Sequence, residues 1–262
     1  MPAAPTITLL TDFGTRDVYA GVMRGVIAGI APAARVVDLT HEVAPQAVDE
    51  AGFLLAQAAP FFPAGTIHVA VVDPGVGTAR KVVCARSSRA VYLAPDNGLL
   101  SRALEQDPPD EVRSVEERRW FLPALSSTFH GRDLFAPVAA HLANGVAPRE
   151  LGPPLERLAG PALERPRRSA GRVVGRVVHV DRFGNLVTDI PTAGLGPIRS
   201  AVVAGREVAG PLARTYGERP AGSLVLLAGS SQTLEVSVVM GSAAELTGAG
   251  PGVEIVVSED GP

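Results

Sequence analysis

The sequence predicts an α/β domain with a central, mostly parallel sheet, followed by a small all-β domain. In the first part of the chain, short apolar runs alternate with segments of helical periodicity, as in folds that carry helices on both faces of a sheet. A stretch at 151–170 then holds four prolines and no clear period. Beyond it, short apolar runs are separated by Gly, Pro and Asn turns, a pattern typical of a small barrel or sandwich.

The length of the chain agrees with this division. Its 262 residues, of which 46% are hydrophobic, can bury the cores of one or two domains. We therefore expect an α/β domain at residues 1–155, a linker at 156–170 and a β-barrel domain at 171–262.

The α/β domain should begin with a short strand at 7–10 and a helix after it. Asp17 precedes that helix and is a candidate for its N-cap. The helix itself is indicated by apolar residues at intervals of four: Val18, Val22, Val26 and Ile30.

The remaining elements of this domain follow from the same patterns. They are expected as strands at 34–39 and 67–72, a helix at 47–59, a strand pair at 81–85 and 90–94, and helices at 97–105 and 133–143. Pro137 fits the last helix because it falls in the first turn, where amides lack intrahelical partners. In the second domain, strands are expected at 172–180, 200–203, 223–227, 233–240 and 253–257.

Composition excludes several classes of function. The net charge of −3 gives no electrostatic footprint for nucleic acid or an anionic membrane surface. The single cysteine, Cys84, excludes an internal disulfide and lies in an apolar stretch, which favours a buried packing role. No segment is apolar enough to span a membrane, so we expect a cytoplasmic protein.

Two aspartates stand at the ends of predicted strands. Asp12 follows the first strand and Asp73 follows the strand at 67–72. Ligands of open α/β sheets bind at the carboxyl ends of strands, so the two can share one crevice. An aspartate there can accept both hydroxyls of a ribose, although either one alone could simply cap a turn.

The segment at 73–80 (DPGVGTAR) places Asp73 and Arg80 around two glycines that allow close backbone approach. It is neither a Walker loop nor a dinucleotide fingerprint, so phosphate binding is weakly supported. Arg80 can reach back to Asp73, the alternative being a surface ion pair of little energetic value.

His130 is the best acid–base candidate among the five histidines. His68 and His179 alternate with apolar strand residues and could be half-buried, His141 lies in a helix, and His41 lies in a loop. His130, Asp133 and Asp73 could be drawn as a metal site, but no ligand spacing supports one, and we expect no metal. Ser126 and Ser127 lie near His130 without the GxSxG elbow of a hydrolase triad.

Two turns of the second domain have both a structural and a functional interpretation. Residues 181–185 (DRFGN) can be either a tight turn or a binding loop in which Phe183 stacks on a base and Asn185 pairs with its edge. Residues 229–231 (GSS) are similarly ambiguous.

Taken together, these segments resemble the S-adenosylmethionine (SAM) hydroxide adenosyltransferases, the adenosine-forming SAM hydrolases related to the SAM-dependent chlorinase and fluorinase. The segments that carry the resemblance are residues 11–14 (TDFG), 73–80 (DPGVGTAR), 94–100 (APDNGLL), 128–133 (TFHGRD), 181–185 (DRFGN) and 229–231 (GSS). They span both domains in the order of the family.

The resemblance implies an α/β domain followed by a β-barrel, and a homotrimer with active sites between the first domain of one subunit and the second domain of the next. Asp73, Arg80 and His130 would be the triad that positions water or hydroxide. The implied substrate contacts are Asp12 for the ribose, Asp17, Ser230, Ser231 and Asp181 for the methionine end, Phe183 and Asn185 for adenine, and Phe129 as a wall of the reaction centre.

The sequence also departs from the halogenase branch. The fluorinase has Tyr in place of Asp73 and Ser in place of Gly131, and it carries a longer loop than the short stretch at 80–94. A carboxylate beside the reacting carbon would repel a halide but could accept a proton from water.

We therefore expect hydrolysis of SAM to adenosine and methionine, with SAM as substrate and no cofactor. A SAM-dependent halogenase and a non-catalytic SAM or adenosine sensor remain alternatives.

Overall fold

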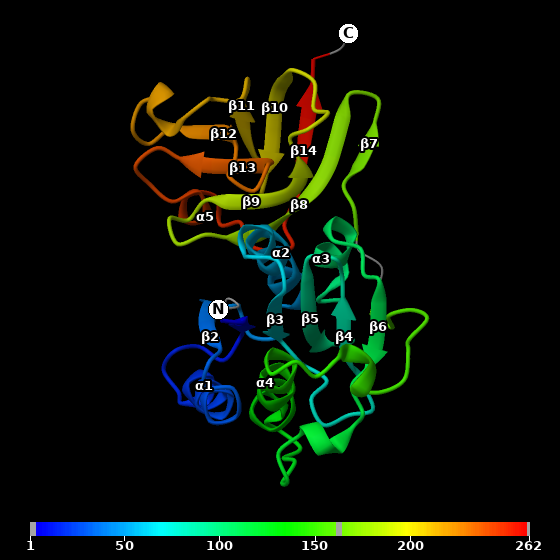
Figure 1. The fold of residues 1–262 in the computed structure, drawn as a ribbon. Coiled ribbons are helices and arrows are strands. Elements are labelled where there is room, and N and C mark those ends of the chain that lie inside the picture. The colour runs from blue at the N-terminus through cyan, green and yellow to red at the C-terminus, as the bar shows by residue number, and fades with distance from the viewer. Residues whose placement is uncertain (1–3, 161–163, 261–262) are drawn as a thin grey trace. The chain divides into compact units, whose positions relative to one another are not determined.

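In this computed structural model, residues 4–160 and 164–260 are described. The chain divides into two compact units, residues 1–163 and 164–262, and each is considered by itself (Figure 1). Across these described ranges, no helix combines the length and the apolar character needed to cross a membrane.

The first unit is built on a six-stranded mixed sheet in the order β2-β1-β3-β5-β4-β6. Its strands are β1 (Thr6–Thr11), β2 (Arg35–Thr40), β3 (Thr66–Val71), β4 (Val82–Arg86), β5 (Ala90–Pro95) and β6 (Glu111–Ser114). The four strands β2, β1, β3 and β5 are parallel, while β4 runs antiparallel to both β5 and β6. The predicted α/β class is confirmed, with a sheet that is mixed: three strand pairings are parallel and two are antiparallel.

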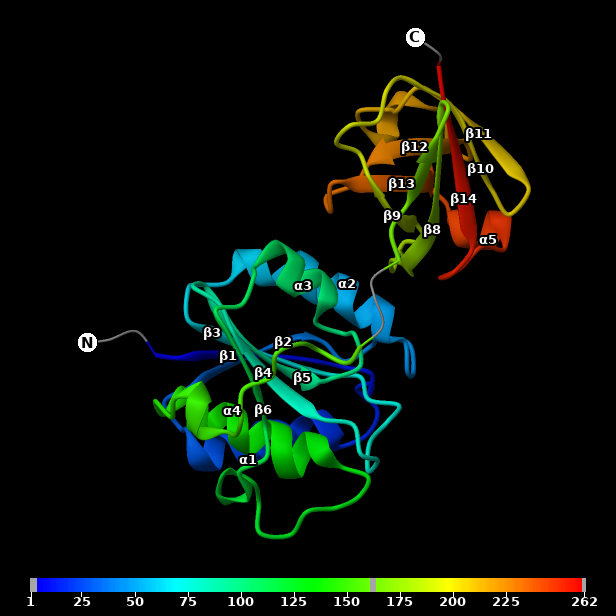
Figure 2. The same ribbon diagram turned by 90° about the vertical axis from the view of Figure 1, so that its right-hand side faces the viewer.

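Helices cover both faces of this sheet, with α1 and α4 on one side and α2 and α3 on the other (Figure 2). Their bounds are α1 (Tyr19–Ile30), α2 (Val48–Ala58), α3 (Ser101–Gln106) and α4 (Ala136–Ala143), the last preceded by a π-helical turn at Gly131–Phe135. Three short 3-10 helices lie at Ala59–Phe61, Arg118–Trp120 and Pro148–Glu150.

The two cores follow from strand alternation, because successive side chains of a strand point to opposite faces. Ile67 and Val69 of β3 pack in the core that contains Met23 of α1. Ala70 packs in the other core, which contains Leu55 of α2.

Several predicted boundaries in this unit were wrong. Helix α1 begins at Tyr19 with Val18 at its N-cap, so Asp17 lies one residue too early and was wrongly predicted as the cap. The helix predicted at 97–105 begins only at Ser101, because Gly98 adopts φ +97° and the preceding residues form a turn. Strand β6 was not predicted, since its four residues carry too little apolar periodicity.

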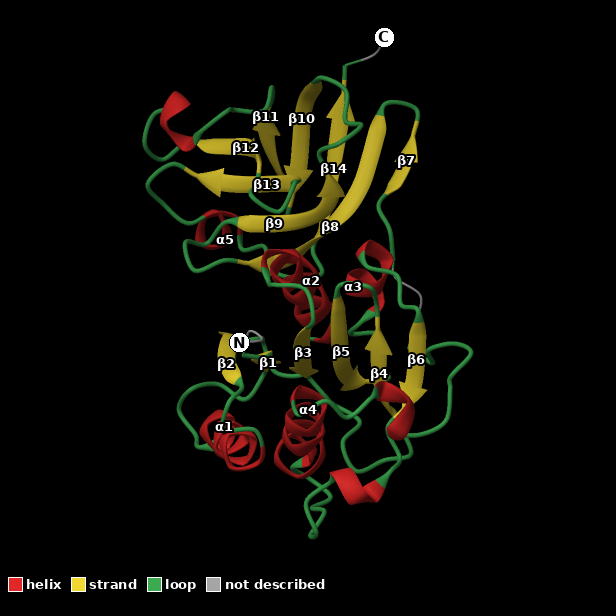
Figure 3. Cartoon of the chain, viewed as in Figure 1, coloured by secondary structure: helices red, strands yellow, loops and turns green. Residues whose placement is uncertain are grey.

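The second unit is an antiparallel, nearly closed, barrel-like sheet in the order β11-β10-β14-β8-β9-β13-β12, with β7 paired to β8 (Figure 3). Its strands are β7 (Arg167–Ser169), β8 (Arg172–Val180), β9 (Leu186–Pro191), β10 (Ile198–Val203), β11 (Arg206–Ala209), β12 (Leu224–Ala228), β13 (Thr233–Val238) and β14 (Glu254–Glu259). A 3-10 helix lies at Tyr216–Glu218, and helix α5 (Ala243–Thr247) is capped by the Ser242 hydroxyl, which accepts from the Glu245 amide.

Three strands of this unit were not predicted. Strand β7 lies inside the expected linker, and its three exposed polar residues give no periodic signal. Strand β9 was missed because polar residues interrupt its apolar run, although it is buried over most of its length. The hydroxyl of its buried Thr188 is satisfied by donating to the Leu234 carbonyl. Strand β11 is a short edge strand paired with β10. Residues 161–163 of the expected linker lie outside the described residues.

Candidate active site

A cavity of about 210 Å³ lies in the first unit at the carboxyl ends of β1 and β3. Asp12 directly follows β1, and Asp73 follows β3 after one intervening residue. Since β1 and β3 are parallel neighbours, both carboxylates reach the same cavity, as predicted. The other expected residues that line it are Phe129, His130 and Gly131.

Asp73, Arg80 and His130 form one connected chain of side chains. Arg80 Nε donates to both carboxylate oxygens of Asp73, at 3.0 and 2.9 Å, and Nη2 donates to Oδ2 as well. The same Nη2 lies 2.8 Å from His130 Nδ1. Only 6% of the Asp73 side chain and 12% of the Arg80 side chain are exposed, so this is a buried pair rather than a surface ion pair.

The protonation state of His130 follows from its neighbours. A guanidinium can only donate, so Nδ1 must accept from Arg80. Burial and the Arg80 charge lower the pKa of His130, against the opposing influence of Asp73 and Asp133. The imidazole is therefore neutral at neutral pH, with its proton on Nε2.

Glycines let the Asp73–Arg80 turn pack closely against the segment that carries His130. Gly77 has φ +77°, and a Cβ there would lie 2.5 Å from the Ser127 carbonyl oxygen. Within the turn, Thr78 donates its hydroxyl to the Gly75 carbonyl at 2.6 Å. Gly77 thus serves close backbone approach, as the sequence indicated for the glycines of this segment.

Part of the cavity lining is aromatic, from Phe13 and Phe129. The ring centroid of Phe129 lies 5.9 Å from that of Phe13 and 5.0 Å from that of Tyr19. A Cβ at Gly131 would lie 3.0 to 3.2 Å from atoms of Phe13, Met23 and Phe129, so this wall is packed against the glycine.

Two models of one family match the chain. The SAM hydroxide adenosyltransferase N-terminal domain matches residues 7–152, and the SAM hydroxide adenosyltransferase C-terminal domain matches residues 175–256. The chain belongs to the SAM hydroxide adenosyltransferase family.

Similar proteins and structures include hydrolases of this name and more distant fluorinases. A Thermus thermophilus protein named (R)-S-adenosyl-L-methionine hydrolase is 43% identical over 258 residues, covering 95% of this chain and 98% of its own. The crystal structure of an uncharacterized conserved protein from Thermotoga maritima superposes with a TM-score of 0.90 at 35% identity, covering 97% of this chain and 100% of that chain. A fluorinase from Actinoplanes sp. is more distant, at 29% identity over 230 residues, covering 75% of this chain and 77% of its own.

Asp12 accepts a hydrogen bond from Gln46, a residue that the sequence did not indicate for the site. The Gln46 amide donates to Asp12 Oδ2 at 2.8 Å, and Gln46 itself adopts φ +66°. A carboxylate accepts about four hydrogen bonds, so Asp12 keeps capacity for the hydroxyls of a ribose. Only the backbone of Gln46 takes part, and a backbone contact leaves no residue-type signal in the sequence.

The other expected substrate residue of the first unit lies apart from this cavity. Asp17 is exposed and lines a separate hollow along α1 with Thr15 and Arg24. Phe13 lines the cavity and was not predicted for the site, although it belongs to the TDFG segment; Tyr19 packs against its ring from outside the lining.

In the second unit, the 181–185 segment is a tight turn with a fixed backbone. Asp181 Oδ1 accepts from the amides of Phe183 and Asn185, and Oδ2 accepts from Asn185 Nδ2, each at 2.9 Å. Asn185 is buried, while Phe183 is 76% exposed. The structural and the functional interpretation of this turn are therefore compatible.

Ser230 and Ser231 lie in the turn between β12 and β13. The turn is closed by the Gly229 amide, which donates to the Thr233 carbonyl at 2.9 Å. The Ser231 hydroxyl lies 2.8 Å from that of Thr233.

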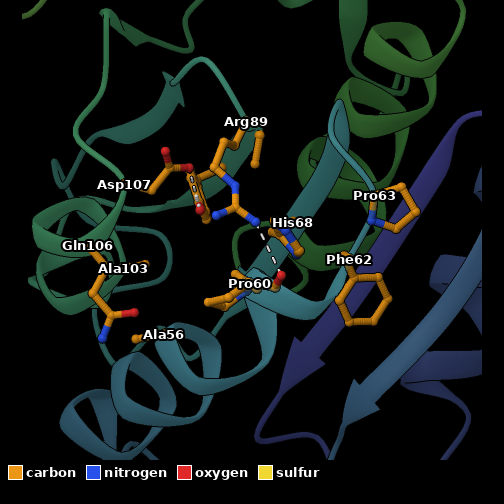
Figure 4. A pocket seen from close by; sticks show the side chains of 12 residues that line it. Ala56, Pro60, Phe62, Pro63, His68, Arg89, Ala103, Gln106 and Asp107 are labelled. Carbon is orange, nitrogen blue, oxygen red and sulfur yellow. Dashed lines mark hydrogen bonds between the residues drawn. The ribbon is translucent and has the colours of Figure 1, made fainter.

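Two other histidines are structural. His68 was expected to be half-buried but is fully buried, with Nδ1 bonded to the Thr8 hydroxyl at 2.8 Å and its ring stacked on Tyr92. It lines a small cavity of about 30 Å³ beside Phe62, Arg89 and Asp107, outside the cavity of Asp73 (Figure 4). His41 is likewise buried, and its Nδ1 bonds the Thr11 hydroxyl at 2.9 Å.

Proposed function

We propose that this chain hydrolyses SAM to adenosine and L-methionine by attack of water on the ribose 5′ carbon. The observation that carries the proposal is the buried Asp73–Arg80–His130 chain beside the Asp12 carboxylate in one cavity. Membership of the SAM hydroxide adenosyltransferase family and the hydrolase name of the Thermus thermophilus relative support it.

The reaction is an in-line displacement. The water oxygen bonds to the 5′ carbon, the bond from that carbon to sulfur breaks, and methionine leaves with the electron pair as a neutral thioether. Because the sulfonium is already activated, the step needs no metal or cofactor; the protein supplies orientation, a dry pocket and a place for the proton.

The substrate contacts are proposals that rest on the family resemblance. Asp12 holds the ribose hydroxyls, and Phe129 walls the reaction centre beside Gly131. Asp17, Asp181, Ser230 and Ser231 hold the methionine end, while Phe183 and Asn185 hold adenine. A homotrimer whose active sites lie between subunits would bring these groups together.

A SAM-dependent halogenase is the second candidate. Fluorinases are relatives, but the carboxylate of Asp73 disfavours a halide beside the reacting carbon because like charges repel strongly in a dry site. A SAM-binding sensor without turnover is the third candidate, and a pure binder has no use for the buried triad.

The test is chromatography of the purified protein incubated with SAM, with and without chloride. Adenosine and methionine in equal amounts, independent of chloride, are the expected products. A halogenated nucleoside would establish the halogenase instead, and unchanged SAM that co-purifies with the protein would establish the sensor.

A further inference from the structure

The loop that carries Asp12 is bonded to a second loop, residues 41–46, which follows β2. The Gly14 amide donates to the His41 carbonyl at 2.7 Å, and the Gln46 amide donates to Asp12 Oδ2 at 2.8 Å. The position of the Asp12 carboxylate therefore depends on where the second loop lies. His41 contacts the first loop through its side chain as well as through its backbone.

The side chain of His41 bonds Thr11, the last residue of β1. Both residues are buried, and Thr11 Oγ1 lies 2.9 Å from His41 Nδ1. The Phe13 amide donates to the same Oγ1 at 3.2 Å. Among the described residues, only His41 offers the Thr11 hydroxyl an acceptor, so the hydroxyl donates to Nδ1. Thr11 thus joins the residues on both sides of Asp12 to His41.

The other nitrogen of the His41 ring faces a carboxylate that is itself anchored. Because Nδ1 accepts, the ring proton is on Nε2, which lies 3.1 Å from Asp38 Oδ1 of β2. This contact lacks the angle of a hydrogen bond and is an electrostatic attraction. Arg24 Nη1 of α1 lies 3.2 Å from Asp38 Oδ2. The ring is therefore fixed from β1 on one side and from β2 and α1 on the other.

The His41 ring acts at a distance from any ligand. Neither His41 nor Thr11 is among the described residues that line the cavity of Asp73, whereas Asp12, Phe13 and Gln46 are. Any influence of the ring on a ligand must therefore pass through these three neighbours.

We propose that His41 is a positioning residue that orients the Asp12 carboxylate toward the two adjacent hydroxyls of a ribose. The inference rests on the proposed function, in which Asp12 holds the ribose. Hydrogen bonds weaken steeply away from their best angle, so one carboxylate serves two neighbouring hydroxyls well only in a fixed orientation. Loss of the Thr11–His41 bond frees the backbone on either side of Asp12. The ligand then loses the contacts of its hydroxyls but keeps those of its base.

The first experiment measures by calorimetry how strongly the protein distinguishes adenosine from 2′,3′-dideoxyadenosine. Wild type should bind adenosine about tenfold to a hundredfold more tightly, as expected for hydrogen bonds to a charged acceptor. Thr11→Val keeps the shape of the side chain and removes its hydroxyl. It should lose most of this ratio through weaker binding of adenosine, with unchanged binding of the dideoxy compound. No discrimination in wild type, or an undiminished ratio in Thr11→Val, would overturn the inference.

The matched control is Thr8→Val. Thr8 lies in the same strand, is equally buried, and has its hydroxyl 2.8 Å from Nδ1 of His68. The control therefore removes the same kind of bond from the same sheet, beside the smaller cavity that His68 lines. It should lower the temperature of thermal unfolding as Thr11→Val does, yet keep the wild-type ratio. Equal loss of the ratio in both variants would make general destabilisation the cause and contradict the positioning role.

The second experiment separates the two nitrogens of His41. The amide oxygen of His41→Asn lies near the place of Nδ1 and can accept from Thr11, whereas the polar atoms of His41→Gln lie near Nε2. In steady-state kinetics, His41→Gln should raise KM for SAM about tenfold and change kcat less than about threefold, since the ribose is held in ground state and transition state alike. His41→Asn should recover most of the loss. An unchanged KM in His41→Gln, or a loss confined to kcat, would refute the assignment.

These measurements separate the inference from the proposed function. If wild type makes no adenosine from SAM while Thr11→Val alone loses the discrimination between the two nucleosides, the proposed function fails and the role of His41 stands. If wild type hydrolyses SAM but Thr11→Val keeps the wild-type ratio, the role of His41 fails and the proposed function stands.

Discussion

At the scale of the residue, Arg80 connects the other two members of the triad. It bonds the Asp73 carboxylate through two nitrogens and His130 through one of them. A lysine cannot reproduce this, because its ammonium lacks the planar fork of the guanidinium.

We expect Arg80→Ala to lower kcat by about a hundredfold or more, as loss of one preorganised donor does in other enzymes, with little change in KM for SAM. Arg80→Lys should recover only part of the loss. Steady-state kinetics of the two variants beside wild type check this. Unchanged turnover in Arg80→Ala would remove Arg80 from its assigned role.

Gly77 is a second residue whose identity is fixed by geometry. Its φ is +77°, and a side chain has no room because a Cβ at this position would lie 2.5 Å from the Ser127 oxygen. Gly77→Ala should destabilise the fold by at least about 1 kcal/mol and displace the His130 segment, so that kcat falls as well.

The matched control is Gly25→Ala. Gly25 lies in α1 with no atom within 4 Å of a Cβ, so alanine should stabilise the helix by about 0.5–1 kcal/mol. Thermal unfolding and steady-state kinetics compare the stability and the kcat of both variants with those of wild type. A Gly77→Ala protein as stable and as active as wild type would contradict the close packing of the two segments.

At the scale of the element, β3 leads towards Asp73 at its carboxyl end and contains a buried histidine. All six of its residues are buried, including His68 near its start. Burial lowers the pKa of His68 from 6.5 to about 4, while nearby Asp107 acts in the opposite direction.

This shift makes stability depend on pH. The unfolded chain takes up the His68 proton below its ordinary pKa near 6.5, whereas the folded chain resists protonation until about 4. Stability from this group is therefore complete above pH 6.5 and is lost as pH falls toward 4, by about 3 kcal/mol in all. Urea unfolding between these pH values measures the slope.

His68→Gln removes the titration and is the control. It should be less stable at neutral pH, because the stacked ring is lost, yet it should lose less stability than wild type on acidification. Burial also lowers the pKa of His141 and His130, so some slope remains. Identical slopes in the two proteins would show that His68 does not set the acid sensitivity.

Some strands could be predicted from the sequence and others could not. Strands β1 and β3 were recognised because their residues are largely apolar, and the placement of Asp12 and Asp73 at one edge then followed from parallel topology. Strands β6, β7 and β11 were missed because short, polar edge strands show no period. The contact of Gln46 with Asp12 was missed because Gln46 acts through its backbone amide, which almost every residue type carries.

At the scale of the whole molecule, the fold tolerates wide sequence change. The Thermotoga maritima structure superposes with a TM-score of 0.90 although only 35% of residues are identical. The residues proposed for the chemical step, Asp73, Arg80 and His130, come from the first unit, whereas those proposed for adenine, Phe183 and Asn185, come from the second unit, residues 164–262.

We expect the active protein to be a homotrimer. Size-exclusion chromatography with light scattering should give about three times the 27.1 kDa chain mass. Dilution to the point of dissociation should abolish turnover, because each site would lose the residues of a neighbouring subunit. A monomer with full activity would contradict the proposed interface sites.

The turn at 181–185 has a consequence for how such an enzyme diversifies. Its shape is set by Asp181, Gly184 and Asn185, and the exposed Phe183 contributes only its own backbone amide to that shape. Position 183 is therefore free to vary without cost to folding. Selection for a different nucleobase could act there first, leaving unchanged the residues of the first unit that are proposed to activate water.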